Sequence, residues 1–217
     1  MKPKTLALIS AMVIATITVS AYYYTILPNT VPTHWNASGK VDSYGSKLIP
    51  VLIMPIVVLL LGSLTVILPK LSPKQFEIEK FQDTYENIMI IVTGLMTYLQ
   101  VVILNATANP KVDIGKWLVS GILLFLAWMG NLMGKTRRNF YMGIRTPWTL
   151  ASDKVWVATH RLGGKLMVIG GLGGAIGCFI GIPPLPCMFG AMILLLYPVI
   201  FSYQYYKKLE EQGELDT

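Results

Sequence analysis

The chain has 217 residues, of which 53% are hydrophobic and only 13% are charged. Soluble domains carry about 25% charged residues, so this composition excludes a surface that is covered by water on all sides. The formal net charge of +7 would suit a nucleic-acid-binding protein, but the places of the basic residues along the chain favour a membrane protein instead.

Six apolar runs are long enough to cross a bilayer, which takes about 20 mainly apolar residues. Lys2, Lys4 and Val19-Ser20-Ala21 resemble a cleaved signal peptide, but the first apolar run continues to Leu27, which favours a retained helix. The sequence therefore predicts an all-α, multi-pass membrane protein with spans at Thr5–Leu27, Leu48–Leu68, Ile88–Ala108, Trp117–Gly134, Lys165–Ile182 and Leu185–Tyr206.

Basic residues are distributed unequally between the connections of these spans. They gather at the start of the chain, in the loop 71–86, in the loop 135–164 and in the tail, whereas the other loops hold only Lys40, Lys47, Lys111 and Lys116. The positive-inside rule therefore predicts that both termini are cytoplasmic. The net charge then serves topology and contact with anionic lipid, and we expect no direct contact with nucleic acid.

The interiors of the spans contain no Asp, Glu, Lys, Arg or His. Pumps and ion-coupled transporters normally place ionisable groups at mid-membrane, so these classes are disfavoured. A small uncoupled channel or transporter remains an alternative, with Gln100 or Asn131 beside its path.

The first outward loop, residues 28–47, is polar and rich in turn-forming residues. Asn36-Ala37-Ser38-Gly39 and Asp42-Ser43-Tyr44-Gly45 both predict turns, so the loop is expected to fold back on itself and to press Trp35 and Tyr44 toward the lipid headgroups. The loop is then either a purely structural connector or a ligand-binding loop, with the candidate residues His34, Trp35, Asn36, Gly39, Asp42 and Lys47.

Enzymatic or metal chemistry has little support in the sequence. The two histidines, His34 and His160, are predicted to lie on opposite sides of the membrane, and no common catalytic motif is present. We expect no catalytic residue, no metal site and no cofactor. A metal-dependent enzyme on the outer face, with ligands drawn from His34, Asp42 and Asp113, remains an alternative.

The long cytoplasmic segment contains GIRTPWT and VWVATHR. Thr149 or Ser152 can cap a short helix that runs to about Arg161, and its flank of Val155, Trp156 and Thr159 predicts that it lies in the membrane interface. This segment is either a connector that rests on lipid or a docking face for a cytoplasmic protein. The loop 71–86 is expected to be a solvated helical lead-in, and the tail a mobile polar end.

Small residues dominate the fifth span. Gly170, Gly174, Gly177 and Gly181 recur at spacings of three and four, which predicts a bare helix face for close packing, against the same chain or against a second copy in an oligomer. Cys178 and Cys187 are expected to be buried, reduced thiols.

Two stretches resemble the SdpI-like family of bacterial membrane proteins. The first is the pattern formed by Pro32, His34, Trp35, Gly39 and Asp42, and the second combines Asn131, Gly143 to Thr149, Trp156 and Thr159-His160-Arg161. The resemblance implies immunity to a secreted antimicrobial peptide of the SDP-toxin type. It also implies signalling by capture of a small winged-helix repressor at the membrane.

We therefore predict a non-enzymatic receptor and immunity protein of the bacterial cell membrane. Residues 1–86 are expected to form an N-terminal unit with the outward loop, and residues 87–217 a C-terminal four-helix unit. The loop 28–47 would contact the toxin. The cytoplasmic docking face would comprise Asn139, Gly143, Arg145, Thr146, Pro147, Trp148, Thr149, Trp156, His160 and Arg161.

Overall fold

A computed structural model describes residues 1–71, 81–139 and 142–216 of the chain. Six of its helices are long and apolar enough to cross a membrane, which confirms the predicted all-α, multi-pass membrane fold. The charged connection predicted at 71–86 lies mostly at 72–80, outside the described residues. The elements are α1 (Pro3–Ile26), β1 (Thr30–Trp35), β2 (Val41–Ser46), α2 (Leu48–Leu71), α3 (Gln82–Ala108), α4 (Ile114–Met133), α5 (Pro147–Ala151), α6 (Asp153–Phe179) and α7 (Pro184–Glu211).

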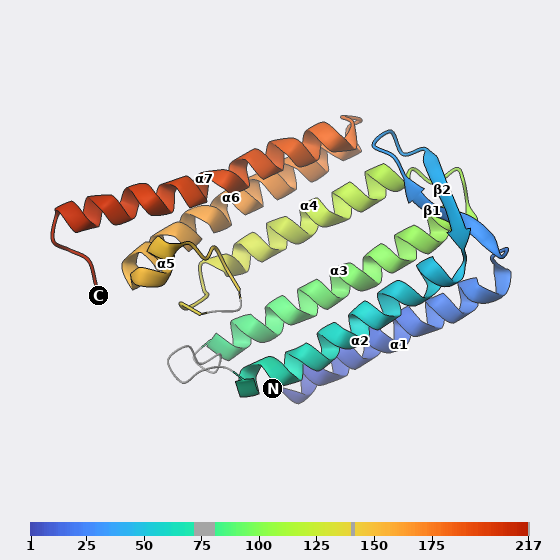
Figure 1. The fold of residues 1–217 in the computed structure, drawn as a ribbon, viewed down its shortest axis with the longest axis horizontal. Coiled ribbons are helices and arrows are strands. Elements are labelled where there is room, and N and C mark those ends of the chain that lie inside the picture. Colours follow the sequence, from blue (N-terminus) through green and yellow to red (C-terminus); the bar gives the residue numbers. More distant parts are fainter. Residues whose placement is uncertain (72–80, 140–141, 217) are drawn as a thin grey trace.

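The six long helices run side by side along the long axis of the molecule (Figure 1). Helices α1, α2 and α3 contact one another, α3 packs on α4, and α6 packs between α4 and α7. The β1–β2 hairpin lies at one end, here the hairpin end, and both chain termini lie toward the other, here the terminal end. His34 and His160 therefore lie at opposite ends. Helix α3 contacts α1 and α2 as well as α4. The predicted division of the chain into the units 1–86 and 87–217 therefore stays a prediction.

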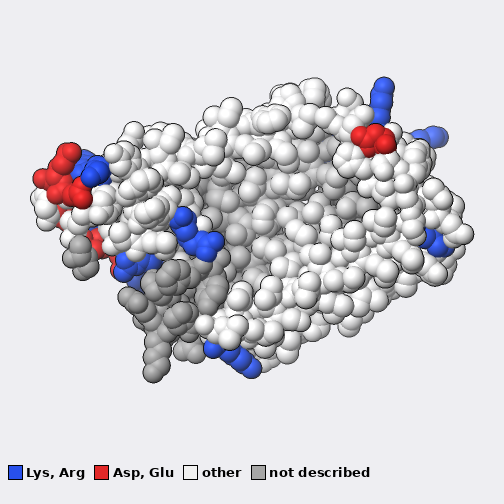
Figure 2. Space-filling view, viewed as in Figure 1, with Lys and Arg blue, Asp and Glu red and all other residues white. Residues whose placement is uncertain are grey.

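Charged side chains gather at the two ends of the molecule, and the face between them is uncharged in Figure 2. Large apolar side chains on the long helices, such as Ile14, Leu60, Ile176 and Ile193, are 58–68% exposed. Such exposure is unfavourable in water but suits contact with acyl chains. The buried acid Glu86 lies near the start of α3, where it accepts hydrogen bonds from the Lys2 N–H (3.0 Å) and the Thr5 hydroxyl.

The prediction of a separate interface helix from residue 152 to 161 is wrong. Helix α6 begins at Asp153 and continues without a break to Phe179. Its Gly163-Gly164 pair does not end it, because a Cβ on Gly164 would meet the Gly130 carbonyl oxygen at 2.5 Å, so close packing on α4 favours glycine within the helix. Val155, Trp156 and Thr159 are buried rather than resting on lipid.

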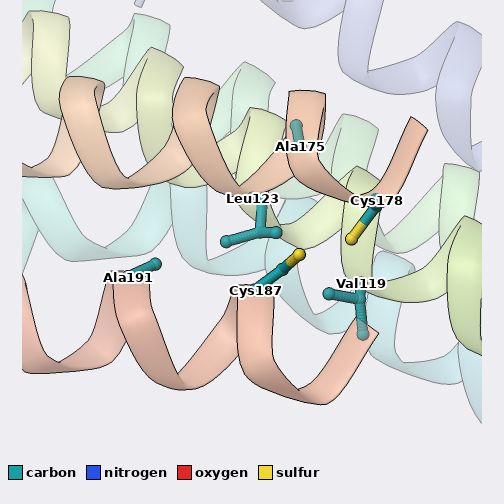
Figure 3. Packing of buried hydrophobic residues seen from close by; sticks show 6 residues of the cluster. All are labelled: Val119, Leu123, Ala175, Cys178, Cys187 and Ala191. Carbon is teal, nitrogen blue, oxygen red and sulfur yellow. The ribbon is translucent and has the colours of Figure 1, made fainter. Parts of the chain in front are cut away.

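The C-terminal part of the core lies between α4, α6 and α7. Its buried side chains come from all three helices, and Cys178 and Cys187 lie close together among them as free thiols (Figure 3), as predicted. The cluster comprises Val119, Leu123, Ala175, Cys178, Cys187 and Ala191.

The predicted glycine face meets α7 of the same chain. A Cβ on Gly170 would meet the Ala191 Cα at 3.2 Å, one on Gly174 the Cys187 carbonyl oxygen at 3.1 Å, and one on Gly177 the Cys187 Sγ at 2.9 Å. The prediction is wrong for Gly181, which follows α6 in a turn with a φ of 101° and has open space around it. There glycine is favoured because the backbone is left-handed.

A second glycine face of α6, which the sequence analysis missed, packs on α4. A Cβ on Gly171 would meet the Ala127 backbone nitrogen at 2.6 Å and would collide with the Leu123 carbonyl oxygen. Two glycine faces on one helix therefore let α4 and α7 both approach the α6 backbone.

Candidate functional site

The predicted outward loop forms a β-hairpin that the sequence analysis did not anticipate. β1 and β2 pair antiparallel, from Thr30 opposite Ser46 to Trp35 opposite Val41. Asn36 builds the turn, because its Oδ1 accepts from the Ser38 and Lys40 N–H groups at 3.0 Å each, and Gly39 completes it with a φ of 73°.

The second predicted turn, at residues 42–45, is wrong, because these residues are part of β2. Gly45 lies in a tight space within the strand rather than in a turn: a Cβ would meet the Thr33 Cγ2 at 3.1 Å and the Ile49 Cδ1 at 3.3 Å. Tyr44 is 65% exposed and Trp35 is half-buried.

His34 and Asp42 face each other across the hairpin. The His34 Nδ1 lies 2.5 Å from the Asp42 Oδ1, and the two side chains are 66% and 41% exposed. Pairs with this much exposure stabilise a protein by roughly 0–1 kcal/mol. The pair therefore contributes little to the fold and leaves polar atoms accessible to a ligand.

Lys47 and Trp35 attach the hairpin to the helices. The Lys47 Nζ donates to the Tyr24 carbonyl (3.0 Å) and the Leu27 carbonyl (3.1 Å), and it lies 4.4 Å from the centre of the Tyr24 ring. It thereby satisfies carbonyl groups at the C-terminal end of α1. Trp35 packs against the cluster of Val102, Ala106 and Ile114. Of the six candidate residues in the loop, Trp35, Asn36, Gly39 and Lys47 therefore have evident structural roles.

At the terminal end, the GIRTPWT segment is held against α6 by His160. The His160 Nδ1 lies 2.8 Å from the Trp156 carbonyl oxygen, and its Nε2 accepts from the Ile144 N–H at 2.9 Å. These partners require a neutral imidazole that carries its proton on Nδ1. The ring also stacks on Trp156 at 4.0 Å.

Gly143 allows this arrangement. It has a φ of 115°, and a Cβ there would collide with the His160 Nε2 and meet the Trp156 ring at 3.2 Å. The Trp156 Nε1 donates to the Thr136 carbonyl at 3.0 Å, so the N–H group of this buried side chain has a hydrogen-bond partner.

Two further groups of buried polar residues shape the same segment. Thr146 and Thr149 form a capping box at α5, and the Thr146 hydroxyl also lies 3.1 Å from the Ser202 hydroxyl of α7. The Asn139 Nδ2 donates to the carbonyl groups of Arg137 and Met142, at 2.7 Å and 3.1 Å. The motif residues therefore bind mainly one another.

The tail folds back onto the start of α6, which contradicts the expected mobile end. Asp216 accepts from the Ser152 hydroxyl and from the Lys154 N–H (3.0 Å), as a negative group at a helix N-terminus should. Burial alone would raise the pKa of Asp216, but the hydrogen bonds from Ser152 and Lys154 outweigh it and leave this pKa below its ordinary value.

The predicted docking face is only partly on the surface. Trp156 and His160 are at most 1% exposed, so the prediction that they anchor a partner directly is wrong. Asn139, Thr146 and Thr149 are also buried, whereas Gly143, Arg145, Pro147 and Arg161 are exposed and Trp148 is half-buried beside Tyr203, at 5.0 Å between rings. The i, i+4 spacing of Trp156 and His160, together with the same spacing of Val155 and Thr159, was the sequence feature that could have indicated a buried face.

Comparisons with known proteins agree with this architecture. The SdpI/YfhL protein family matches residues 135–203, and a domain of unknown function (DUF1648) matches residues 11–59. The first match covers the GIRTPWT segment, α5, α6 and most of α7, and the second covers the hairpin with most of α1 and part of α2.

A curated relative aligns with most of the chain. The Immunity protein SdpI of Bacillus subtilis (strain 168) is 29% identical over 192 residues, which are 88% of this chain and 90% of the relative. No solved structure matches. The alignment over most of both chains and the six candidate spans show a multi-pass cell-membrane protein, which is similar to the SdpI/YfhL family over residues 135–203.

Proposed function

We propose that this protein is a non-enzymatic immunity protein that protects its cell from a secreted antimicrobial peptide. The observation that carries this proposal is the alignment over 88% of the chain with a relative named as an immunity protein. The hairpin end would face outward, toward the toxin, and the terminal end would face the cytoplasm. Exposed basic residues at the terminal end support this orientation; they include Lys135, Arg137, Arg161, Lys207 and Lys208.

The His34–Asp42 pair is the proposed polar contact for the toxin. It is exposed, and it adds little stability, so its removal should affect recognition more than folding. We expect His34→Ala and Asp42→Asn each to reduce resistance at least roughly tenfold, the loss expected for a charge-assisted hydrogen bond. The measurement is the toxin concentration that halves growth of a sensitive strain, with membrane abundance measured by immunoblot.

Lys40→Ala is the matched control for this experiment, because Lys40 is exposed on the same turn and only its backbone bonds to Asn36. It should leave resistance unchanged. If His34→Ala lost abundance in proportion to resistance, the pair would be structural and the recognition role would be rejected.

The proposed orientation has its own test. The native thiols, Cys178 and Cys187, are buried, so an added surface cysteine should dominate labelling by a membrane-impermeant maleimide. We expect Ser38→Cys, in the hairpin turn, to react in intact cells, and Arg161→Cys to react only after the membrane is permeabilised. The opposite labelling pattern would show that the hairpin faces the cytoplasm, and the proposed contact between the hairpin and the toxin would be rejected.

The finer part of the proposal is signalling through capture of a small cytoplasmic repressor. The exposed Arg145 and Arg161 and the half-buried Trp148, near the start of α6, support it, since Trp and Arg are among the residues that most often dominate protein interfaces. The proposed contact residues are now Arg145, Trp148 and Arg161, rather than the buried Trp156 and His160. The buried network would position this surface without touching the partner.

A further inference from the structure

A groove of about 450 Å³ runs between α3 and α4, which lie side by side in Figure 1. Several of the side chains that line it are 46–60% exposed: Trp117, Leu124, Trp128 and Phe179. They belong to the spans α4 and α6, so their exposed surface meets acyl chains rather than water. The groove therefore opens sideways into the bilayer.

The groove follows one face of α4. Trp117, Gly121, Leu124 and Trp128 line it at spacings of four, three and four, which place them on the same side of a helix. Gly121 leaves the groove open, because a Cβ there would collide with the Tyr98 ring of α3. The Tyr98 ring therefore occupies the space that a side chain at position 121 would take.

The lining offers little to a polar ligand. The Tyr98 hydroxyl already donates to the Trp117 carbonyl oxygen at 2.8 Å, and Ser120 is only 1% exposed. The rest of the lining is apolar or aromatic. Apolar cavities do not hold ordered water, and a peptide would bring backbone N–H and C=O groups that this lining cannot satisfy. A hydrocarbon chain needs no such partner.

The length and direction of the groove match one leaflet of a membrane. Trp117 and Trp128 are eleven residues apart, so the groove extends about 17 Å along α4. The hydrocarbon core of a bilayer is about 30 Å thick, so each leaflet contributes about 15 Å. Trp117 lies near the start of α4 at the hairpin end. An acyl chain of the leaflet at that end would follow the groove from Trp117 inward.

A lysine lies where the headgroup of such a lipid would be. Lys116 precedes Trp117, and its Nζ lies 5.5 Å from the centre of the Phe179 ring, which lines the groove. Its side chain is half-buried and forms no ion pair among the described residues. The nearby Asp113 caps α4 instead, by accepting from the Lys116 backbone N–H at 3.0 Å. The ammonium group therefore complements an anionic group at this end of the groove.

We propose that the groove binds one phospholipid from the leaflet at the hairpin end. One acyl chain lies between Trp117 and Trp128, and the lipid phosphate pairs with Lys116. The chain completes the packing between α3 and α4, where Gly94 and Gly121 supply no side chains. This site is independent of the proposed function, since its ligand is a membrane lipid and not the toxin.

The test uses the full-length protein, delipidated in detergent and titrated by native mass spectrometry. The two probes are dipalmitoyl phosphatidylglycerol and dipalmitoylglycerol, which have the same acyl chains but differ in the phosphate. We expect one bound lipid per chain and a Kd about tenfold lower for the phospholipid, as a charge-assisted hydrogen bond predicts. Lys116→Gln should bind both lipids equally. Lys40→Gln, which removes an exposed charge at the same end but away from the groove, should bind like the native protein.

A second variant tests the path of the acyl chain. Leu124→Trp fills the middle of the groove and should abolish binding of both lipids. Leu172→Trp is its matched control, because Leu172 lies on α6 with similar exposure, 45% against 46%, and does not line the groove. It should bind both lipids like the native protein. If Leu124→Trp fails to fold, Lys116→Gln decides the question.

Three results would overturn the inference. The first is equal affinity of the native protein for the two lipids, and the second is stoichiometric binding that survives Leu124→Trp. The third concerns protein taken directly from membranes: a second copy of the chain, or a peptide, that Leu124→Trp releases in place of a phospholipid.

Discussion

Gly171→Leu is expected to prevent the native packing of α4 on α6. A Cβ at this position would meet the backbone of Ala127 at 2.6 Å and collide with the carbonyl oxygen of Leu123. Backbone atoms cannot rotate away, so the two helices would have to separate along the most extensive helix contact in the fold. Overpacking of this kind costs about 3 kcal/mol or more. The measurement is the midpoint of thermal unfolding of the purified full-length protein.

The control for this substitution is Gly173→Leu, two residues further along α6. Gly173 has no atom within 4 Å of a Cβ, and leucine favours helix over glycine by up to about 1 kcal/mol. We therefore expect Gly173→Leu to leave the midpoint unchanged or to raise it. Equal losses in both variants would mean that glycine is needed for a property of α6 itself, and not for its contact with α4.

His160→Leu is expected to loosen the GIRTPWT segment from α6. Leucine cannot accept from the Ile144 N–H and cannot stack on Trp156, so a buried donor and half of an aromatic pair are left without partners. An unsatisfied buried group costs about 1–3 kcal/mol, and the lost ring contact adds to it. The same thermal measurement should show a lower midpoint, and a protease should cleave the segment 135–146 more readily.

Arg161→Ala is the neighbouring variant with the opposite expectation. Arg161 is exposed on the same helix, and surface substitutions usually change stability by less than about 0.5 kcal/mol. Stability should therefore persist, while co-purification of the proposed repressor should fall. If His160→Leu lost capture without any loss of stability, and Arg161→Ala lost neither, His160 would be a docking residue after all and the structural assignment would be withdrawn.

The membrane architecture could be predicted because it depends on composition along the chain. Apolar runs of span length, such as Leu48–Leu68, have one stable solution in lipid, a helix that satisfies its own backbone. The six spans therefore follow from the sequence, and most of their ends lie within about six residues of the prediction. The exception is α6, which begins at Asp153 instead of the predicted Lys165. The same holds for the buried thiols of Cys178 and Cys187, because free cysteine is among the residue types that are most often buried.

The sequence by itself thus determined which segments enter the membrane and how many there are. Only the tertiary structure decided what the motif residues do, because their partners are distant in the chain. Gly45 lies in a strand, close to Thr33 and Ile49, rather than in a turn, and His160 is buried and bonded to Ile144 rather than exposed for docking. The amide nitrogen of Gln100 donates to Ser20 and Pro50, whereas its Oε1 has no hydrogen-bond partner among the described residues. Local patterns report hydrophobicity and backbone preference, whereas these roles depend on which atoms meet when separate helices pack.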